Sequence, residues 1–315
     1  MTSNEYSSPI ISLNQMLTNK LELMDHQQNN KGLVGISTGF TNVDRVLGGY
    51  NKGTVTIIGA RPGMGKTSFL INCMLKSNHL KPVPMLYVSF ENGEDYFISR
   101  LLSLDSKIPN HNIIKGELSN EDKEDIHRSA ENIKDLPISF QEDVFTAEQL
   151  IDVVTKAVID LKVEAVYLDY LQLIRCNYPN KNRERDVNEI MRSLKELAKK
   201  LNIAIVVTSQ LSRAVETRGG DKRPMLSDLR ESGSIEQMAD AVIFLYRPEY
   251  YGFTEWQDCR PCNGEADLII AKNKRGPLED IRFSFKARHL EFSEINRDED
   301  NFFDNPFMKE DFKPF

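Results

Sequence analysis

Long apolar segments are absent from this sequence of 315 residues, and tryptophan occurs once. The most apolar stretches, 163–174 and 203–208, are short or interrupted by charge, whereas a membrane span needs roughly 18 uninterrupted apolar residues. The first ten residues, MTSNEYSSPI, have neither a basic start nor an apolar core, so no secretory signal is expected. These absences predict a cytoplasmic protein.

Cysteine is also scarce, with four residues that are too scattered for a disulfide scaffold. Cys259 and Cys262 have the CxxC spacing of a metal-binding pair. A structural zinc site needs four ligands, and the sequence contains no second pair. The favoured interpretation is an ordinary loop with two thiols, and a metal site is the alternative.

The overall charge excludes little. The chain has 40 Lys and Arg against 47 Asp and Glu, a net charge of −7, with 40% hydrophobic residues. This composition is typical of a soluble globular protein and excludes disorder of the chain as a whole. An acidic average does not exclude nucleic-acid binding, because phosphate contacts depend on local basic clusters.

From residue 35 onward, apolar runs alternate with segments of helical periodicity. The runs lie at 54–59, 85–90, 136–140, 163–168, 203–208 and 241–246. The alternation predicts βαβ units, and therefore an α/β fold with a mostly parallel sheet and helices on both faces. Thr146 and Gln149 form a capping box for one helix that reaches Leu161, and a second stripe covers 187–201. We expect each of these two helices to cover one side of the sheet.

The ends of the chain differ from this body. Ser12 to His26 predicts an amphipathic helix, joined by a polar linker, whose apolar stripe packs on its own domain or on a neighbouring subunit. Two apolar runs, 266–271 and 281–286, flank KNKRGPLED and predict a C-terminal β-hairpin with a basic tip. The acidic and aromatic end is either disordered or a peptide that docks on a partner. We expect a linker helix and linker at 1–34, an α/β body at 35–295 and a tail at 296–315.

The segment TIIGARPGMGKTS starts at Thr56 and combines an apolar strand, a glycine-rich turn and the start of a helix. This is a P-loop, apart from Ala60 at the position where the strict pattern has glycine. Its backbone N–H groups and helix N-terminus attract phosphate, Lys66 adds a positive charge, and the Thr67 hydroxyl suits Mg²⁺. We expect the nucleotide to be bound by Arg61, Pro62, Gly63, Met64, Gly65, Lys66, Thr67 and Ser68.

Three polar residues follow other predicted strands. Asp169 follows VYL and suits a Mg²⁺ ligand beside Thr67, while Glu91 follows LYVSF and suits a base for the attacking water. Gln210 follows the run at 203–208 and could sense the γ-phosphate through its amide. Ligands of open α/β sheets bind outside the carboxyl ends of the strands. We therefore expect these side chains to meet near the P-loop; a solvated carboxylate is the alternative for Glu91.

Two loops near the same edge are rich in basic residues. Residues 175–186 hold four basic and two acidic residues, and 213–230 hold five basic and three acidic ones. Basic loops beside an ATP site suggest contacts to a nucleic-acid backbone, and ordinary solvated loops are the alternative.

Taken together and in order, the motifs of residues 35–290 resemble the ATPase domain of the DnaB-family replicative DNA helicases, phage members included. They are IIGARPGMGKTS, VSFE, VYLDYLQL, TSQLSR, DLRESGSIEQMAD and IIAKNKRGP. The resemblance implies a RecA-like motor that forms a hexameric ring, with ATP and Mg²⁺ between subunits and single-stranded DNA in the channel. It gives Glu91 the role of catalytic base, Asp169 that of the acid at the metal and Gln210 that of the link from ATP to the DNA loops.

The resemblance also implies a DNA-backbone contact at Arg230, Glu231 and Gly233. The basic hairpin tip would reach the γ-phosphate of the neighbouring subunit. Where the family commonly has Lys-x-Arg-Asn-Gly, this chain has Lys272-Asn273-Lys274-Arg275-Gly276. A shift of one residue turns a strand side chain to the opposite face, so Lys274 and Arg275 both stay candidates for the finger.

Family members carry an N-terminal collar domain that meets primase, and the helix at Ser12 to His26 resembles only the linker helix that grips the adjacent subunit. The implied partners are single-stranded DNA, further copies of the chain and a primase or helicase loader, in the cytoplasm of a bacterial or phage-infected cell. The function expected is therefore an ATP-dependent helicase. The alternatives are a RecA-like ATPase of recombination or repair without unwinding, and a nucleotide-gated interaction module.

Overall fold

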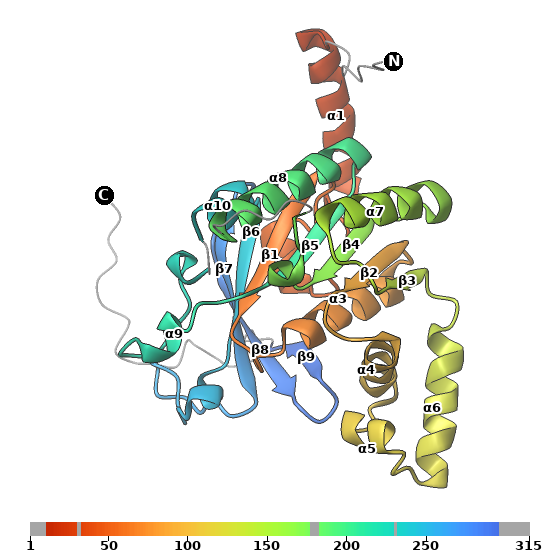
Figure 1. Ribbon diagram of the computed structural model, residues 1–315, viewed down its shortest axis with the longest axis vertical. Coiled ribbons are helices and arrows are strands. Elements are labelled where there is room, and N and C mark those ends of the chain that lie inside the picture. Colours follow the sequence, from red (N-terminus) through yellow and green to blue (C-terminus); the bar gives the residue numbers. More distant parts are fainter. Residues whose placement is uncertain (1–10, 30–32, 177–182, 230–231, 296–315) are drawn as a thin grey trace.

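A single nine-stranded sheet runs through the body, with helices on both of its faces (Figure 1). The computed structural model describes residues 11–29, 33–176, 183–229 and 232–295. The strands are β1 (Thr54–Ala60), β2 (Met85–Ser89), β3 (Ile138–Gln141), β4 (Ala165–Asp169), β5 (Ala204–Gln210), β6 (Ala241–Tyr246), β7 (Glu265–Asn273), β8 (Asp280–Lys286) and β9 (Glu291–Glu294). The helices are α1 (Leu13–Asn29), α2 (Thr41–Leu47), α3 (Lys66–Leu80), α4 (Glu94–Ser106), α5 (Asn110–Lys115), α6 (Asn120–Ile133), α7 (Ala147–Leu161), α8 (Arg183–Leu201), α9 (Ala214–Thr217) and α10 (Ser232–Met238).

The strand order is β3-β2-β4-β5-β1-β6-β7-β8-β9. In this order, all neighbours from β3 through β6 pair in parallel, and β7, β8 and β9 continue the sheet with antiparallel pairs. All residues of β1, β2, β4 and β6 are buried, as expected for parallel strands covered on both faces. The six predicted strands and the predicted hairpin are confirmed, and β9 is an addition to that hairpin.

The helices on the two faces differ from the prediction in one respect. Helices α7, α8 and α10 lie on one face, where α8 contacts both of the others, and α3 and α4 pack on the other face. The expectation that α7 and α8 cover opposite sides is therefore wrong. The chain moves along the sheet in one direction from β3 to β4 to β5, and right-handed crossovers in one direction place their helices on one face. The connections from β1 to β2 and from β2 to β3 run the other way, so their helices cover the other face.

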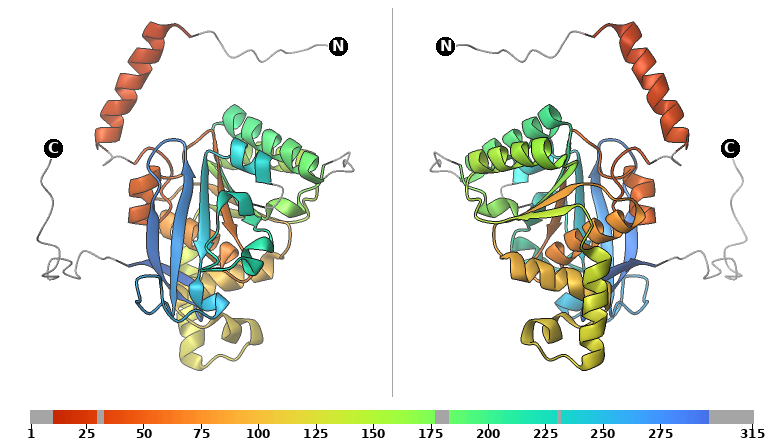
Figure 2. Two further views of the ribbon diagram at one scale, coloured as in Figure 1. Left: turned by 90° about the vertical axis from the view of Figure 1, so that its left-hand side faces the viewer. Right: turned by 90° about the vertical axis from the view of Figure 1, so that its right-hand side faces the viewer.

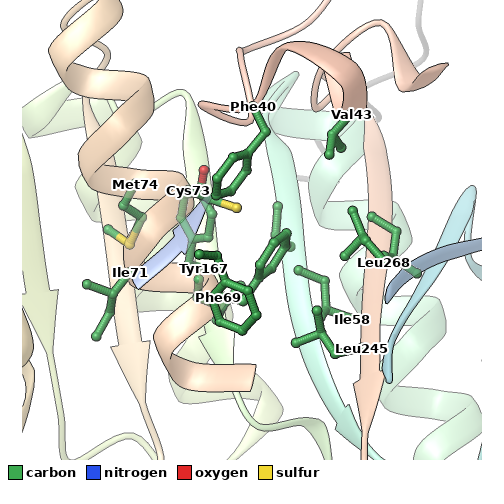
Figure 3. Close-up of a cluster of buried hydrophobic side chains, with 14 of the residues drawn as sticks. Phe40, Val43, Ile58, Phe69, Ile71, Cys73, Met74, Tyr167, Leu245 and Leu268 are labelled. Carbon is green, nitrogen blue, oxygen red and sulfur yellow. The ribbon is translucent and has the colours of Figure 1, made fainter. Parts of the chain in front are cut away.

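The core under α3 fixes the start of that helix (Figure 3). Phe69 is fully buried between Phe40, whose ring stacks at 5.5 Å, and Phe292, whose ring meets it edge-on at 5.4 Å. Tyr167 from β4 lies in the same cluster. Because close-packed side chains hold the first turn of α3 against the sheet, the loop before that turn is positioned rigidly.

Capping at the predicted helix starts is confirmed. Thr146 accepts a hydrogen bond from the Gln149 backbone, and the Gln149 side chain accepts one in return. In α1 the backbone of Gln15 donates to the Ser12 hydroxyl at 3.3 Å.

Helix α1 projects from the body in Figure 2. Its apolar stripe is at least half exposed, and its members are Leu13, Met16, Leu17, Leu21 and Met24.

Within the described residues, none of the helices combines the length and apolar character that a bilayer crossing demands. The tail expected at 296–315 lies outside the residues that the structure describes.

Candidate nucleotide-binding site

The turn between β1 and α3 needs glycine for two reasons. Gly63 and Gly65 have φ values of 76° and 100°, in the left-handed region that glycine adopts without steric cost. A Cβ on Gly63 would lie 2.9 Å from the ring of Tyr250, and one on Gly65 would lie 3.1 Å from that of Phe292. The backbone therefore turns tightly here and leaves the first N–H groups of α3 open to a ligand.

A cleft of about 510 Å³ lies against this turn. Four elements bring the predicted residues into it: Lys66 comes from the start of α3, Glu91 follows β2, Asp169 ends β4 and Gln210 ends β5. The P-loop residues that line it are Pro62, Gly63, Gly65, Lys66, Thr67 and Ser68. This is the carboxyl edge of the parallel strands, where open α/β sheets bind ligands.

Asp169 is buried and accepts three hydrogen bonds from hydroxyl groups. Thr67 and Thr208 donate at 2.5 Å, and Tyr87 donates at 3.0 Å. A carboxylate beside a threonine hydroxyl is the oxygen-only donor set that Mg²⁺ takes in phosphate sites, where it keeps several waters. Thr67 and Asp169 therefore fit a magnesium ion.

Lys66 is largely buried, and its ammonium donates to the carbonyl oxygens of Ala60 at 3.1 Å and Arg61 at 3.2 Å. Burial lowers the pKa of Lys66 to about 8, although the charges of Asp169 and Glu91 act in the opposite direction. A desolvated ammonium of this kind favours an anion that reaches it, because the anion restores its charged form.

Two of the predicted nucleotide-binding residues, Arg61 and Met64, do not line the cleft. Met64 is buried. The Arg61 guanidinium donates to Glu216 at 2.8 Å and to the carbonyl of Leu211 at 2.6 Å, so its side chain joins the P-loop to the segment that follows β5.

The end of β5 is also tied to the segment after β4. The Gln172 amide donates to Ser209 at 2.9 Å and accepts from the backbone of Gln210 at 3.1 Å. Beyond Gln210, Leu211 pairs with Leu229 in an isolated antiparallel bridge. The chain leaving the cleft is thus bonded to the residues just before Arg230.

Several cleft residues were not predicted from the sequence. Tyr96 and Arg100 come from α4, Arg247 follows β6 and Phe285 lies in β8. The Arg247 guanidinium lies 4.3 Å from the centre of the Phe285 ring and forms an ion pair with Glu249. The spacing of Tyr96 and Arg100 by four residues, just after Glu91, was the one available pointer, because residues four apart share a helix face.

The basic residues of the hairpin lie at the opposite edge of the sheet from the cleft, where the parallel strands begin. Strand β7 runs antiparallel to β6, with Asn273 opposite Ala241 at the start of β6. Lys272 donates to the carbonyl of Glu236, Lys274 lies 3.4 Å from Asp240, and Arg275 donates to Asn51 at 3.0 Å. The turn between β7 and β8 lies toward α1 in Figure 2. Lys272, Lys274 and Arg275 are therefore not brought into the cleft of their own chain.

The remaining predictions concern a DNA contact and a pair of thiols. Gly233 is exposed in the first turn of α10, and Arg230 and Glu231 lie outside the described residues. Cys259 is exposed, while the buried Cys262 donates to the carbonyl of Phe253 at 3.1 Å. Across the part of the chain that the structure describes, no three His, Cys, Asp or Glu residues gather as a metal cluster.

The P-loop at the end of β1, the acid at the end of β4 and the strand β5 between them define a RecA-type nucleotide-binding domain. The chain belongs to the family of the DnaB-like helicase C-terminal domain, whose model matches residues 35–294.

Individual relatives agree with this assignment. The replicative DNA helicase DnaB of Rickettsia typhi is 36% identical over 86% of this chain and 59% of its own length. The replicative DNA helicase DnaC of Bacillus subtilis is 33% identical over 92% of this chain and 63% of its own. This chain thus spans about three fifths of the length of such relatives.

Solved structures of the same kind superimpose closely. One is the structure of an isolated ATPase domain, with a TM-score of 0.82 and 30% identity, and the match covers 91% of this chain and all of that domain. A DnaB-like replicative helicase, described with its interactions with primase, has a TM-score of 0.79 and 30% identity, over 92% of this chain and 68% of its own.

Proposed function

We propose that this chain is an ATP-driven motor that moves on single-stranded DNA in the cytoplasm and unwinds duplex DNA as part of a ring. The family membership supports this proposal. The observation that carries it is the convergence of Lys66, Glu91, Asp169 and Gln210 on one cleft at the carboxyl edge of the sheet. A phosphate site that also holds an acid, a base and an amide has the parts that hydrolysis of a phosphoanhydride needs.

In this proposal the phosphates of ATP lie on the P-loop backbone, and Lys66 neutralises their charge. Glu91 is exposed at the mouth of the cleft, where it can take the proton of an attacking water. Gln210 orients the water or the γ-phosphate through its amide. Thr67 and Asp169 would hold Mg²⁺, which supplies neutralisation of negative charge on the phosphate oxygens.

The position of the hairpin supports action between subunits. The cleft lies at one edge of the sheet, and Lys272, Lys274 and Arg275 lie at the other. A head-to-tail arrangement of copies can bring the hairpin of one subunit to the cleft of the next, and such contacts close into a ring when the rotation permits. We propose a hexamer in which Lys274 or Arg275 acts as the finger in trans. The exposed stripe of α1 suits a contact with the adjacent copy.

The DNA contact is proposed for Arg230, Glu231 and Gly233. The support is the bonded path from the cleft: Gln210 continues into Leu211, which pairs with Leu229. A change at the γ-phosphate can therefore move the loop before α10. A primase or helicase loader is the proposed protein partner. We also propose the division into a linker helix and linker at 1–34, a motor at 35–295 and an acidic and aromatic tail at 296–315.

Steady-state ATP hydrolysis, measured with and without single-stranded DNA, tests this proposal. We expect DNA to raise the rate, Lys66→Ala to abolish it and Arg230→Ala to remove the stimulation alone. Arg128→Ala is the matched control, because Arg128 is exposed on α6 and pairs with Asp125. A rate that DNA leaves unchanged in an assembled ring would contradict the DNA assignment.

A further inference from the structure

Helix α4 directs two of its side chains at the first turn of α3. Phe97, Leu101 and Leu104 are buried in the core on the side of α4 that faces the sheet. Tyr96 and Arg100 are one helical turn apart and line the nucleotide cleft. Because the apolar face fixes the helix against the core, the side chain of Arg100 starts from a fixed position beside the cleft.

The contacts of Arg100 are all to neutral groups. Its guanidinium donates to the Ser68 hydroxyl at 2.9 Å and to the Tyr96 hydroxyl, and lies 4.1 Å from the centre of the Tyr96 ring. Its Nε is buried and has no hydrogen-bond partner among the described residues. No carboxylate of the residues that the structure describes forms an ion pair with Arg100. A guanidinium that is partly withdrawn from water without an anionic partner is costly.

Arg247 offers a direct comparison on the other side of the cleft. It also lines the cleft, and its Nε is likewise buried without a hydrogen-bond partner among the described residues, but its guanidinium forms an ion pair with Glu249. The charge of Arg247 is therefore balanced within the protein, whereas that of Arg100 is not. An anionic ligand would supply the missing balance.

We propose that Arg100 binds the diphosphate portion of the nucleotide, a contact that deepens the proposed function and depends on it. Ser68 is in the first turn of α3, where backbone N–H groups are open to an anion. Thr67, one residue earlier, bonds to Asp169 on the side of the cleft assigned to the metal and the γ-phosphate. Arg100 reaches the helix at Ser68, the next residue into the helix after Thr67. Its fork of donors then binds oxygens that ADP and ATP share.

Calorimetric titration with ADP tests this assignment on the full chain. Since a hydrogen bond to a charged group contributes about 1.5–3 kcal/mol, Arg100→Gln should weaken ADP binding by about ten- to one-hundred-fold. A non-hydrolysable ATP analogue should lose the same factor, because the contact is to the shared phosphates. Arg128→Gln, an exposed arginine of α6, should leave both affinities unchanged.

The conservative variant separates a phosphate contact from a structural role. Arg100→Lys keeps the charge and loses the fork, so it should bind ADP with an affinity between those of the wild type and Arg100→Gln. Thermal unfolding without nucleotide checks that both variants fold. The proposal is overturned if folded Arg100→Gln binds ADP like the wild type, if Lys binds no better than Gln, or if only the ATP analogue is affected. A wild type that binds no ADP would instead overturn the proposed function.

Discussion

Lys66 links the charge of the cleft to pH. Its pKa is lowered to about 8 by burial, so the free protein loses this positive charge as the pH rises through about 8. A bound phosphate chain favours the charged form and raises the pKa again. Binding above pH 8 therefore takes up a proton, and nucleotide affinity falls as the pH rises, by at most about tenfold per pH unit.

Titration of ADP at pH 7 and pH 9, in two buffers of different ionisation enthalpy, measures both quantities. We expect weaker binding and proton uptake at pH 9, and neither effect at pH 7. Lys66→Ala should lose the difference between the two pH values along with most of the affinity. Equal wild-type affinities at pH 7 and pH 9 would mean that Lys66 does not titrate in this range.

Prediction from sequence succeeded for those cleft residues whose position follows from strand order. Glu91, Asp169 and Gln210 each follow an apolar run, and parallel strands end at one edge. The side chains of Arg100 and Arg247 reach the cleft through tertiary packing, which leaves no local pattern. Arg61 lies in the P-loop motif, yet its side chain bonds to Glu216, and no motif distinguishes a backbone contact from a side-chain contact.

At the scale of elements, the proposed action of the β7–β8 hairpin on the neighbouring subunit can be tested. Its basic residues lie at the sheet edge opposite the cleft. Mixing two inactive proteins should therefore restore part of the ATPase activity. One carries Lys66→Ala with an intact hairpin, and the other carries an intact P-loop with a substituted finger. Some mixed interfaces then combine both intact parts.

The finger substitution is made separately as Lys274→Ala and Arg275→Ala, and hydrolysis is measured after mixing with the Lys66→Ala protein. We expect one of the two to be inactive alone and to recover on mixing, which identifies the finger. The other variant is the matched control. If each inactive finger variant stays inactive at every mixing ratio, the hairpin does not act across subunits.

Helix periodicity and capping were predictable, and the packing face was not. The box of Thr146 and Gln149 starts α7 as expected, because its hydrogen bonds involve neighbours in the chain. Which face α7 and α8 cover depends on the order of β3, β4 and β5 in the sheet. That order is set by long-range pairing, which periodicity does not encode. Strand β9 has four residues, too few to show an alternation.

At the scale of the whole molecule, the cleft and the hairpin occupy opposite edges of one continuous sheet. One continuous sheet thus gives each copy two different surfaces, which the proposed head-to-tail ring would bring together. Helix α1 projects from the body, and its exposed apolar stripe adds a third surface. The fold class and the parallel part of the sheet followed from the alternation of apolar runs. The proposed assembly did not, because contacts between copies leave no period in the sequence.

Unwinding of a forked DNA duplex, measured as strand separation in the presence of ATP, tests the motor assignment most directly. The account predicts ATP-dependent unwinding by the wild type and none by Glu91→Gln, since loss of a general base typically slows the reaction by about 10²–10⁴-fold. Glu94→Gln, a change at an exposed carboxylate three residues away, should unwind like the wild type. DNA-stimulated hydrolysis without strand separation would contradict the account and favour a recombination-type ATPase. Unwinding by Glu91→Gln at the wild-type rate would contradict the role of the cleft itself.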